Sequence, residues 1–184
     1  MYIINPDPYI TPCYRNLPFT TSDIAYNLNL HHGDAIDQYL SDRFKDRKTK
    51  YTINGREAIF MALSHYKLSQ DDLVTVLTTS NNFYVSSCVT NTIERFCKWS
   101  REIVAETKVI LVVHEFGYIS PEMDKIASLN IPIIEDLAPS FFSNDDNNMA
   151  GMYGDFAIYS FPKLFPLQLG GLLLNNKDLP TPES

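Results

Sequence analysis

The sequence is poor in glycine and cysteine and has no long apolar run. Only seven glycines occur in 184 residues, and no G-x-G-x-x-G follows the first predicted strand, so a dinucleotide-binding fold has no direct support. The three cysteines, Cys13, Cys88 and Cys97, are odd in number and match no zinc spacing, so we expect reduced thiols in a cytoplasmic protein. The longest apolar runs, 109–113 and 172–174, are far too short for a membrane span.

Positive charge is also scarce. Fifteen Lys and Arg residues face 22 Asp and Glu, which gives a net charge of -7 and argues against a nucleic-acid partner. The one basic run, residues 43–50, we interpret as the solvated end of a helix, with phosphate or partner binding as the alternative. His31 and His32 have no acid or cysteine at metal-ligand spacing, so we expect no metal site. The N-terminus lacks the pattern of a signal peptide.

Apolar patterning predicts strands that alternate with helices. Between an irregular arm over the first thirty residues and a polar loop at 144–148, the pattern predicts helices at 34–44, from 54 onward, 83–93 and 121–129, and strands at 73–77, 109–113, 131–134, 156–161 and 172–174. This order is typical of an α/β domain with a mostly parallel sheet flanked by helices. We divide the chain into an arm and helix (1–50), the α/β domain (51–176) and a tail (177–184).

A lysine and an aspartate end two of these strands. Lys163 closes a Ser-x-x-Lys turn after the strand at 156–161, and Asp136 follows the strand at 131–134. Functional residues of parallel sheets lie at the carboxyl ends of the strands. An enzyme that uses pyridoxal phosphate (PLP) needs a lysine amine for a Schiff base and a carboxylate that keeps the pyridinium nitrogen protonated. The two residues therefore indicate a PLP site.

A capped helix start supplies a candidate anion site. Asn54 precedes Gly55 and Arg56, and Glu57 stands three residues after the asparagine, which is the capping-box pattern. The amide groups at the start of such a helix bind anions such as phosphate. We expect this turn to face the phosphate of the cofactor.

Five motifs, taken in order, resemble those of the DegT/StrS family, the PLP-dependent aminotransferases of nucleotide-sugar and surface-polysaccharide biosynthesis. They cover roughly residues 50 to 176, and each alone is a weak signal. The motifs are Asn54-Gly55-Arg56-Glu57-Ala58-Ile59, Val113-His114-Glu115-Phe116-Gly117 with Met123-Asp124, Ile134-Glu135-Asp136-Leu137-Ala138, the run from Gly154 to Lys163, and Gly170-Gly171.

The resemblance implies the large domain of a fold-type-I aminotransferase and a role for each matching residue. The lysine at Lys163 holds the cofactor aldehyde, the serine at Ser160 touches the phosphate, and the aspartate at Asp136 pairs with the pyridine nitrogen. The turn at Gly55 and Arg56 offers amide groups to the phosphate. A ring from the segment 82–84 stacks on the cofactor; we favour Phe83, with Tyr84 next.

The sequence departs from the family in three places. Pro139 stands where the family has an amide or imidazole near the cofactor ring, and the stretch between Ile93 and Val109 is shorter than usual. The family also carries a C-terminal small domain, which these 184 residues do not include. The resemblance therefore implies a large domain that lacks this second domain.

Each candidate residue also has a plainer interpretation. Lys163 alone could be a surface lysine, Asp136 a solvent-exposed loop acid and Ser160 a turn cap. His114 is either a hydrogen-bonded structural histidine or a residue beside the cofactor. Strand alternation sends Glu135 to the other side from Asp136, so Glu135 is the weaker candidate for the pyridine nitrogen.

Two functions follow from these patterns. The first is an aminotransferase in which Lys163 moves the proton while an amino group passes from a donor such as glutamate to a keto-sugar nucleotide. The second is a non-catalytic domain of the same fold that acts as a binding or assembly partner. We expect a homodimer in either case, and a separate chain could supply the missing domain. A third interpretation is an α/β domain whose motifs are coincidental.

Overall fold

The computed structural model describes residues 34–45, 47–165, 167 and 169–177. Most of the predicted arm lies outside this part of the chain, together with Cys13 and the pair His31 and His32. Residues 178–184 of the predicted tail also lie outside it.

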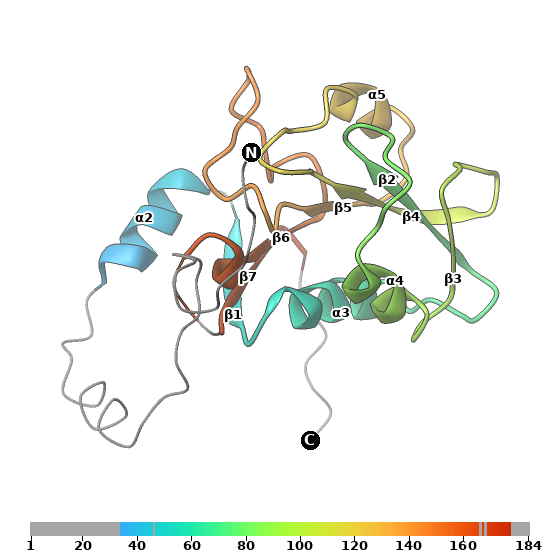
Figure 1. Ribbon diagram of the computed structural model, residues 1–184, viewed down its shortest axis with the longest axis horizontal. Coiled ribbons are helices and arrows are strands. Elements are labelled where there is room, and N and C mark those ends of the chain that lie inside the picture. The colour runs from blue at the N-terminus through green and yellow to red at the C-terminus, as the bar shows by residue number, and fades with distance from the viewer. Residues whose placement is uncertain (1–33, 46, 166, 168, 178–184) are drawn as a thin grey trace, which may run out of the picture.

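A seven-stranded mixed sheet forms the centre of the described chain (Figure 1). The strand order is β1-β7-β6-β5-β4-β2-β3, in which β2 through β6 pair in parallel and β7 runs antiparallel between β6 and β1. The predicted α/β fold with a mostly parallel sheet is confirmed. The strands are β1 (Lys48–Thr52), β2 (Leu73–Thr78), β3 (Lys98–Ser100), β4 (Thr107–Val113), β5 (Ile133–Asp136), β6 (Phe156–Ser160) and β7 (Gly171–Asn175).

Helices cover both faces of the sheet (Figure 1). α3 (Gly55–His65) and α4 (Ser87–Ile93) lie on one face, where their apolar side chains pack against β2, β4, β5, β6 and β7. On the other face, α2 (Ala35–Arg43) packs over β6 and β7, and α5 (Met123–Ala127) packs over β4 and β5. The central strands are therefore apolar on both faces, as expected of a covered parallel sheet.

The start of α3 is held by the predicted cap. The Asn54 side chain accepts a hydrogen bond from the Glu57 amide at 3.0 Å, and the Glu57 carboxylate accepts one from the Ile53 amide at 2.7 Å. These two bonds satisfy amide groups that have no partner within the helix. They fix the first turn of α3 directly after β1.

Both edge strands were missed by the sequence patterns. β1 lies in the segment interpreted as the end of a helix, but α2 stops at Arg43 and residues 48–52 pair with β7. β3 lies in the short stretch before Val109 and pairs with β2. Both strands pair with segments that are distant in the sequence, so local apolar patterning does not predict them. β1 also runs across the boundary that we placed at residue 50.

Two helices are shorter than predicted. α4 begins at Ser87 instead of Phe83, because the Ser86 side chain accepts a bond from the Cys88 amide at 3.4 Å and caps the helix there. α5 covers only Met123–Ala127 of the predicted 121–129. The polar segment 144–148 forms the predicted loop, and most of its side chains are exposed.

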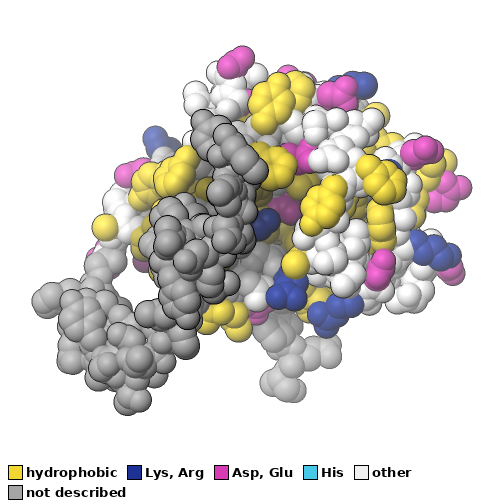
Figure 2. Space-filling view, in the orientation of Figure 1, with side chains coloured by type: hydrophobic (Ala, Val, Ile, Leu, Met, Phe, Trp, Pro, Cys, Tyr) yellow, Lys and Arg dark blue, Asp and Glu magenta, His cyan; other side chains and the backbone are white. Residues whose placement is uncertain are grey.

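Hydrophobic side chains also reach the surface. Figure 2 shows them on the visible face among acidic and basic groups. The most exposed large ones are Phe83 and Phe116, at 94% and 91% of their full accessible area. No helix within the described ranges is both long enough and apolar enough to cross a bilayer.

The paired glycines hold the strand β7 against the start of α3. The Gly170 amide donates to the Ile53 carbonyl at 2.7 Å, and Gly170 has φ +124°, which favours glycine. A Cβ atom on Gly171 would lie 2.6 Å from Thr52 Oγ1 and 2.7 Å from the Asn54 carbonyl carbon. The pair therefore permits a close approach of three backbone segments beside the first turn of α3.

Gly171→Ala is expected to lower the free energy of unfolding by about 2 kcal/mol, because the added methyl meets backbone atoms that cannot move aside cheaply. Urea unfolding followed by circular dichroism measures the change. Gly55→Ala is the matched control: its Cβ would come no closer than 3.3 Å to Ser160 Cβ, so its cost should be clearly smaller. Equal stabilities of the two variants would contradict this close approach.

Candidate active site

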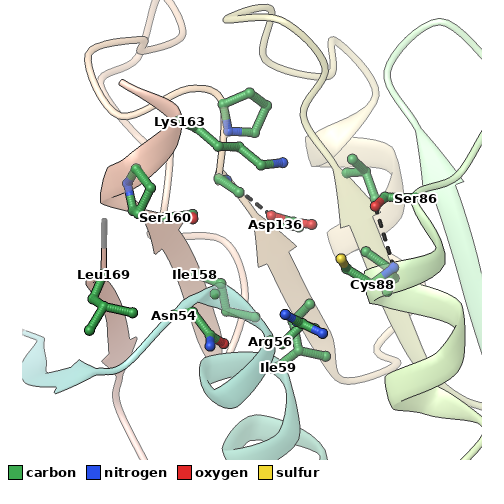
Figure 3. A pocket seen from close by; sticks show the side chains of 16 residues that line it. Asn54, Arg56, Ile59, Ser86, Cys88, Asp136, Ile158, Ser160, Lys163 and Leu169 are labelled. Carbon is green, nitrogen blue, oxygen red and sulfur yellow. Dashed lines mark hydrogen bonds between the residues drawn. The ribbon is translucent and has the colours of Figure 1, made fainter. Parts of the chain in front are cut away.

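A cavity of about 390 Å³ opens where the ends of β4, β5 and β6 meet the first turns of α3 and α4 (Figure 3). This volume is in the range of small-molecule sites. It lies at the carboxyl ends of parallel strands, which is where such sheets place their ligands. The lining residues are Asn54, Gly55, Arg56, Ile59, Ser86, Cys88, Val89, Val113, Asp136, Ala138, Pro139, Ile158, Ser160, Pro162, Lys163 and Leu169.

Lys163 enters the cavity from the short helix η1 (Phe161–Lys163), which directly follows β6. The turn is closed by a bond from the Leu164 amide to the Phe161 carbonyl at 3.0 Å. Figure 3 shows the Lys163 side chain extending from this turn over the end of β5, where Asp136 lies. Lys163 is an exposed residue that also lines the cavity, so its amine is accessible to a small molecule.

Asp136 lies at the base of the cavity and is only 5% exposed. It is the last residue of β5, so the interpretation as a solvent-exposed loop acid is wrong. Burial raises the pKa of its carboxyl, while the Ala138 amide, which donates to Oδ1 at 3.0 Å, and the charge of Lys163 act in the opposite direction. A buried carboxylate of this kind gains from a cationic partner such as a protonated ring nitrogen.

The opposite wall is built for an anion. Gly55 and Arg56 form the first turn of α3, and Ser160 at the end of β6 faces them so closely that a Cβ on Gly55 would lie 3.3 Å from Ser160 Cβ. Figure 3 shows the Arg56 side chain rising from this turn toward the same space. A helix N-terminus, a hydroxyl and a guanidinium together suit a phosphate group.

Phe83 is the one predicted site residue that the structure does not bring to the cavity. It is absent from the lining residues, and its ring is 94% exposed. The loop before it is held outward, because Arg101 donates to the Asn82 carbonyl at 2.7 Å and the Tyr84 amide donates to the Asn82 side chain at 3.1 Å. Tyr84, the second candidate, is 71% exposed.

The cavity contains residues that the sequence interpretation did not single out. Ser86, Cys88 and Val89 come from the start of α4, which we had placed four residues too early. Ser86 is a good N-cap residue, so this signal was present in the sequence. Leu169 also lines the cavity, as does Asn54, the cap residue that the sequence pattern did indicate.

His114 and Glu135 lie beneath the cavity and do not line it. Both are fully buried, and the His114 ring accepts a bond from the Ser120 amide at 3.1 Å. The structure therefore favours the structural interpretation of His114. Glu135 turns away from Asp136, as strand alternation predicts.

The chemistry of the lining residues fits PLP. Lys163 offers an amine for the aldehyde, Asp136 a buried carboxylate for the ring nitrogen, and the wall of Gly55, Arg56 and Ser160 a set of donors for the phosphate. Pro139 lines the same space and offers no donor to the ring. Among the residues that the structure describes, no cluster of three or more His, Cys, Asp or Glu side chains could hold a metal ion.

Cys88 provides a chemical probe of the cavity. In a Cys13→Ser variant, the remaining thiols are Cys88, which is exposed and lines the cavity, and Cys97, which is buried. We expect iodoacetamide to label Cys88 first, and PLP at about 100 times its Kd to slow that labelling by up to ~100-fold, because roughly a hundredth of the cavities then remain empty. A labelling rate that PLP leaves unchanged would place the ligand elsewhere.

Comparisons with known proteins find similarity to one family of aminotransferases. Residues 97–179 match the family model of the DegT/DnrJ/EryC1/StrS aminotransferase family. EpsN of Bacillus subtilis (strain 168), which carries the name of a pyridoxal phosphate-dependent aminotransferase, is 24% identical over 170 residues that cover 79% of this chain and 44% of EpsN. The chain therefore spans less than half the length of this curated relative.

Solved structures share the fold. The aminotransferase TlmJ from Streptoalloteichus hindustanus has a TM-score of 0.66 at 17% identity, over 85% of this chain and 49% of TlmJ. NtdA from Bacillus subtilis, solved with bound PMP, has a TM-score of 0.65 at 22% identity, over 85% of this chain and 40% of NtdA. The predicted fold of the large domain of fold-type-I aminotransferases is thereby confirmed.

Proposed function

Because residues 97–179 match the model of the DegT/DnrJ/EryC1/StrS aminotransferase family and EpsN is similar over 170 residues, we propose that the chain belongs to this family and forms the PLP-binding part of an aminotransferase. The proposed reaction moves an amino group from a donor such as glutamate to a keto-sugar nucleotide for surface polysaccharide. One observation carries the proposal: Asp136 at the end of β5 and Lys163 in the turn after the neighbouring β6 line one cavity with the anion wall of Gly55 and Ser160.

PLP, when bound, acts as an electron sink that makes a proton on the adjacent carbon of an amino acid acidic. Within this chain, the Lys163 amine is placed to hold the cofactor and to move that proton, because it reaches into the cavity from above Asp136. The Asp136 carboxylate is almost fully shielded from solvent. In this position it is placed to keep the ring nitrogen protonated. Ser160 and the first turn of α3 orient the phosphate end.

The proposal also includes the partners. We propose a homodimer, and the exposed aromatic residues Phe83, Phe116 and Tyr118 in the loops after β2 and β4 support it, since such side chains are common in interfaces. A separate chain that supplies the second domain, and a cytoplasmic location, belong to the same proposal.

One observation favours a second candidate, a PLP-fold domain that binds or assembles without catalysis. Pro139 lines the cavity and offers no hydrogen-bond donor there. This candidate predicts cofactor binding, or the bare fold, without amino transfer.

A half-reaction separates the two candidates. The purified chain is loaded with PLP, and glutamate is added while the visible spectrum is recorded. Conversion of the cofactor to its amino form, with 2-oxoglutarate released in equal amount, supports the aminotransferase. A cofactor band that glutamate leaves unchanged, both alone and with a chain carrying the second domain, supports the non-catalytic candidate. Alanine in place of glutamate tests donor choice.

A further inference from the structure

A second carboxylate lies directly behind the cavity. Glu135 and Asp136 are consecutive on β5, so their side chains point to opposite faces of the sheet. Asp136 lines the cavity, whereas Glu135 is fully buried on the other side, at 0% exposure. Burying a carboxylate costs several kcal/mol unless hydrogen bonds and charges compensate for the lost water.

The Glu135 carboxylate is compensated by three backbone amides. Oε2 accepts from Gly151 at 2.9 Å, and Oε1 accepts from Tyr153 at 2.9 Å and from Gly154 at 3.0 Å. An ionised carboxylate has only acceptor sites, so it satisfies all three donors at once. Glu135 therefore ties the end of β5 to the segment that leads into β6, the strand that carries Ser160.

His114 contacts the same carboxylate from the neighbouring strand end. Its Nδ1 accepts from the Ser120 amide at 3.1 Å, so the proton of the neutral ring is on Nε2. Nε2 lies 3.4 Å from Glu135 Oε2, and both side chains have no exposed area. The imidazole is thus held by the segment after β4 and lies beside Glu135, and its Nε2 has no hydrogen-bond partner among the described residues.

His114 is also connected to Asp136 through its backbone. Its amide donates to the Asp136 carbonyl at 2.9 Å, and its carbonyl accepts from the Ser140 hydroxyl at 3.0 Å. Ser140 belongs to the turn after Asp136, and in that turn the Ala138 amide donates to the Asp136 carboxylate. The Asp136 carbonyl and the turn that holds its carboxylate are therefore both linked to His114.

We propose that Glu135 and His114 are positioning residues that fix the direction and depth of the Asp136 carboxylate in the cavity. The inference rests on the proposed function, because it concerns how Asp136 meets the ring nitrogen of PLP. Anchoring Glu135 on one face prevents the strand end from rotating, and Asp136 must then point to the other face. A buried polar pair stabilises a fold no better than well-packed apolar residues do, but it fixes geometry.

Glu135→Gln tests this role. The amide keeps the size of the side chain but turns one NH2 group against the backbone donors, so the end of β5 loses its anchor. We expect the PLP Kd, measured by fluorescence quenching, to rise about 10-fold, the order seen when outer partners of a ligand residue are removed. We also expect a change in the pH at which the absorption band of the bound cofactor is half converted, because the contact between Asp136 and the ring changes.

Tyr159→Phe is the matched control. Tyr159 is fully buried on the same face as Glu135, and its hydroxyl has no hydrogen-bond partner in the part of the chain that the structure describes. Removing that hydroxyl disturbs the same core but breaks none of the hydrogen bonds around Asp136. The PLP Kd and the absorption band of the bound cofactor should therefore match those of the wild type. All measurements are made at a temperature where circular dichroism shows each variant fully folded.

Two His114 variants keep the test decisive if Glu135→Gln does not fold. In His114→Gln the side-chain amide reaches Glu135 as Nε2 does, whereas in His114→Asn it reaches only the Ser120 amide. We expect a PLP Kd within about 3-fold of wild type for His114→Gln and about 10-fold weaker for His114→Asn. Equal Kd values for the two variants would overturn the proposal, and so would a Glu135→Gln chain that binds PLP like wild type.

Failure of the proposed function gives a different result. If the wild-type chain itself does not bind PLP, the proposed function fails, and the positioning role falls with it. If wild type binds PLP and the buried pair can be changed without effect, only the positioning role fails.

Discussion

Lys163→Ala is expected to remove the visible band of the PLP-loaded chain and its borohydride-stable adduct, and to lower turnover by on the order of 10⁴-fold or more. The reason is geometric: Lys163 lines the cavity above Asp136 and can reach both the cofactor aldehyde and the proton that moves. Absorption spectroscopy and an amino-transfer assay on the same preparation measure both effects. Loss of both the visible band and turnover would indicate that one amine both holds the cofactor and moves the proton.

Two controls sharpen this prediction. Lys163→Arg keeps a positive charge in the cavity but has no amine that condenses with an aldehyde, so it should fail in the same way. Lys125→Ala removes an exposed lysine of α5 that pairs with Glu122, far from the machinery, and should behave as wild type. A Lys163→Ala chain that keeps the band and activity would show that another amine holds the cofactor.

Asp136→Asn is expected to have opposite effects on activity and on stability. Turnover should fall by about 10² to 10³-fold, because the asparagine amide is neutral and lacks the negative charge that stabilises a protonated ring nitrogen. The free energy of unfolding of the cofactor-free chain should rise by about 1 kcal/mol near pH 8, since a buried charge is removed while the Ala138 amide keeps an oxygen acceptor.

The pH dependence of this stability follows from the raised pKa of Asp136. Burial raises that pKa, so the folded chain holds the carboxyl proton more tightly than the unfolded chain does. The resulting stabilisation is complete below the pKa of the unfolded chain and is lost as pH rises through the folded pKa. The free energy of unfolding of Asp136→Asn should therefore exceed that of wild type by little in acid and by more as pH rises. Urea unfolding at several pH values measures this, and a variant less stable than wild type near pH 8 would contradict it.

Much of the fold could be predicted because local signals agreed with tertiary structure. The capping pattern at Asn54 placed α3, and the apolar runs of β2, β4 and β6 placed the central strands within about two residues. β1 and β3 could not be predicted in this way, because short exposed edge strands become strands only through pairing with β7 and β2. The start of α4 was misplaced because β-branched residues and serines weaken a helical pattern.

The site was predictable where residues end strands and less so where they belong to loops. Lys163, Asp136, Ser160, Gly55 and Arg56 all line the cavity, since the strand ends and the helix start bring them to one edge of the sheet. Phe83 does not, because its direction depends on hydrogen bonds from Arg101 and Tyr84 to Asn82 that no local pattern encodes. The anchoring of Asp136 by Glu135 likewise depends on a loop sixteen residues or more away in sequence.

The most direct test of a cofactor site at Lys163 is to mix the purified chain with PLP, reduce it with borohydride and map the modified lysine by peptide mass spectrometry. We expect a visible band before reduction and a PLP adduct on Lys163, in about one copy per chain. The same reaction on Lys163→Arg should give no adduct at that position. Reduction spread over exposed lysines such as Lys98 and Lys125, with no visible band, would contradict a cofactor site in this cavity.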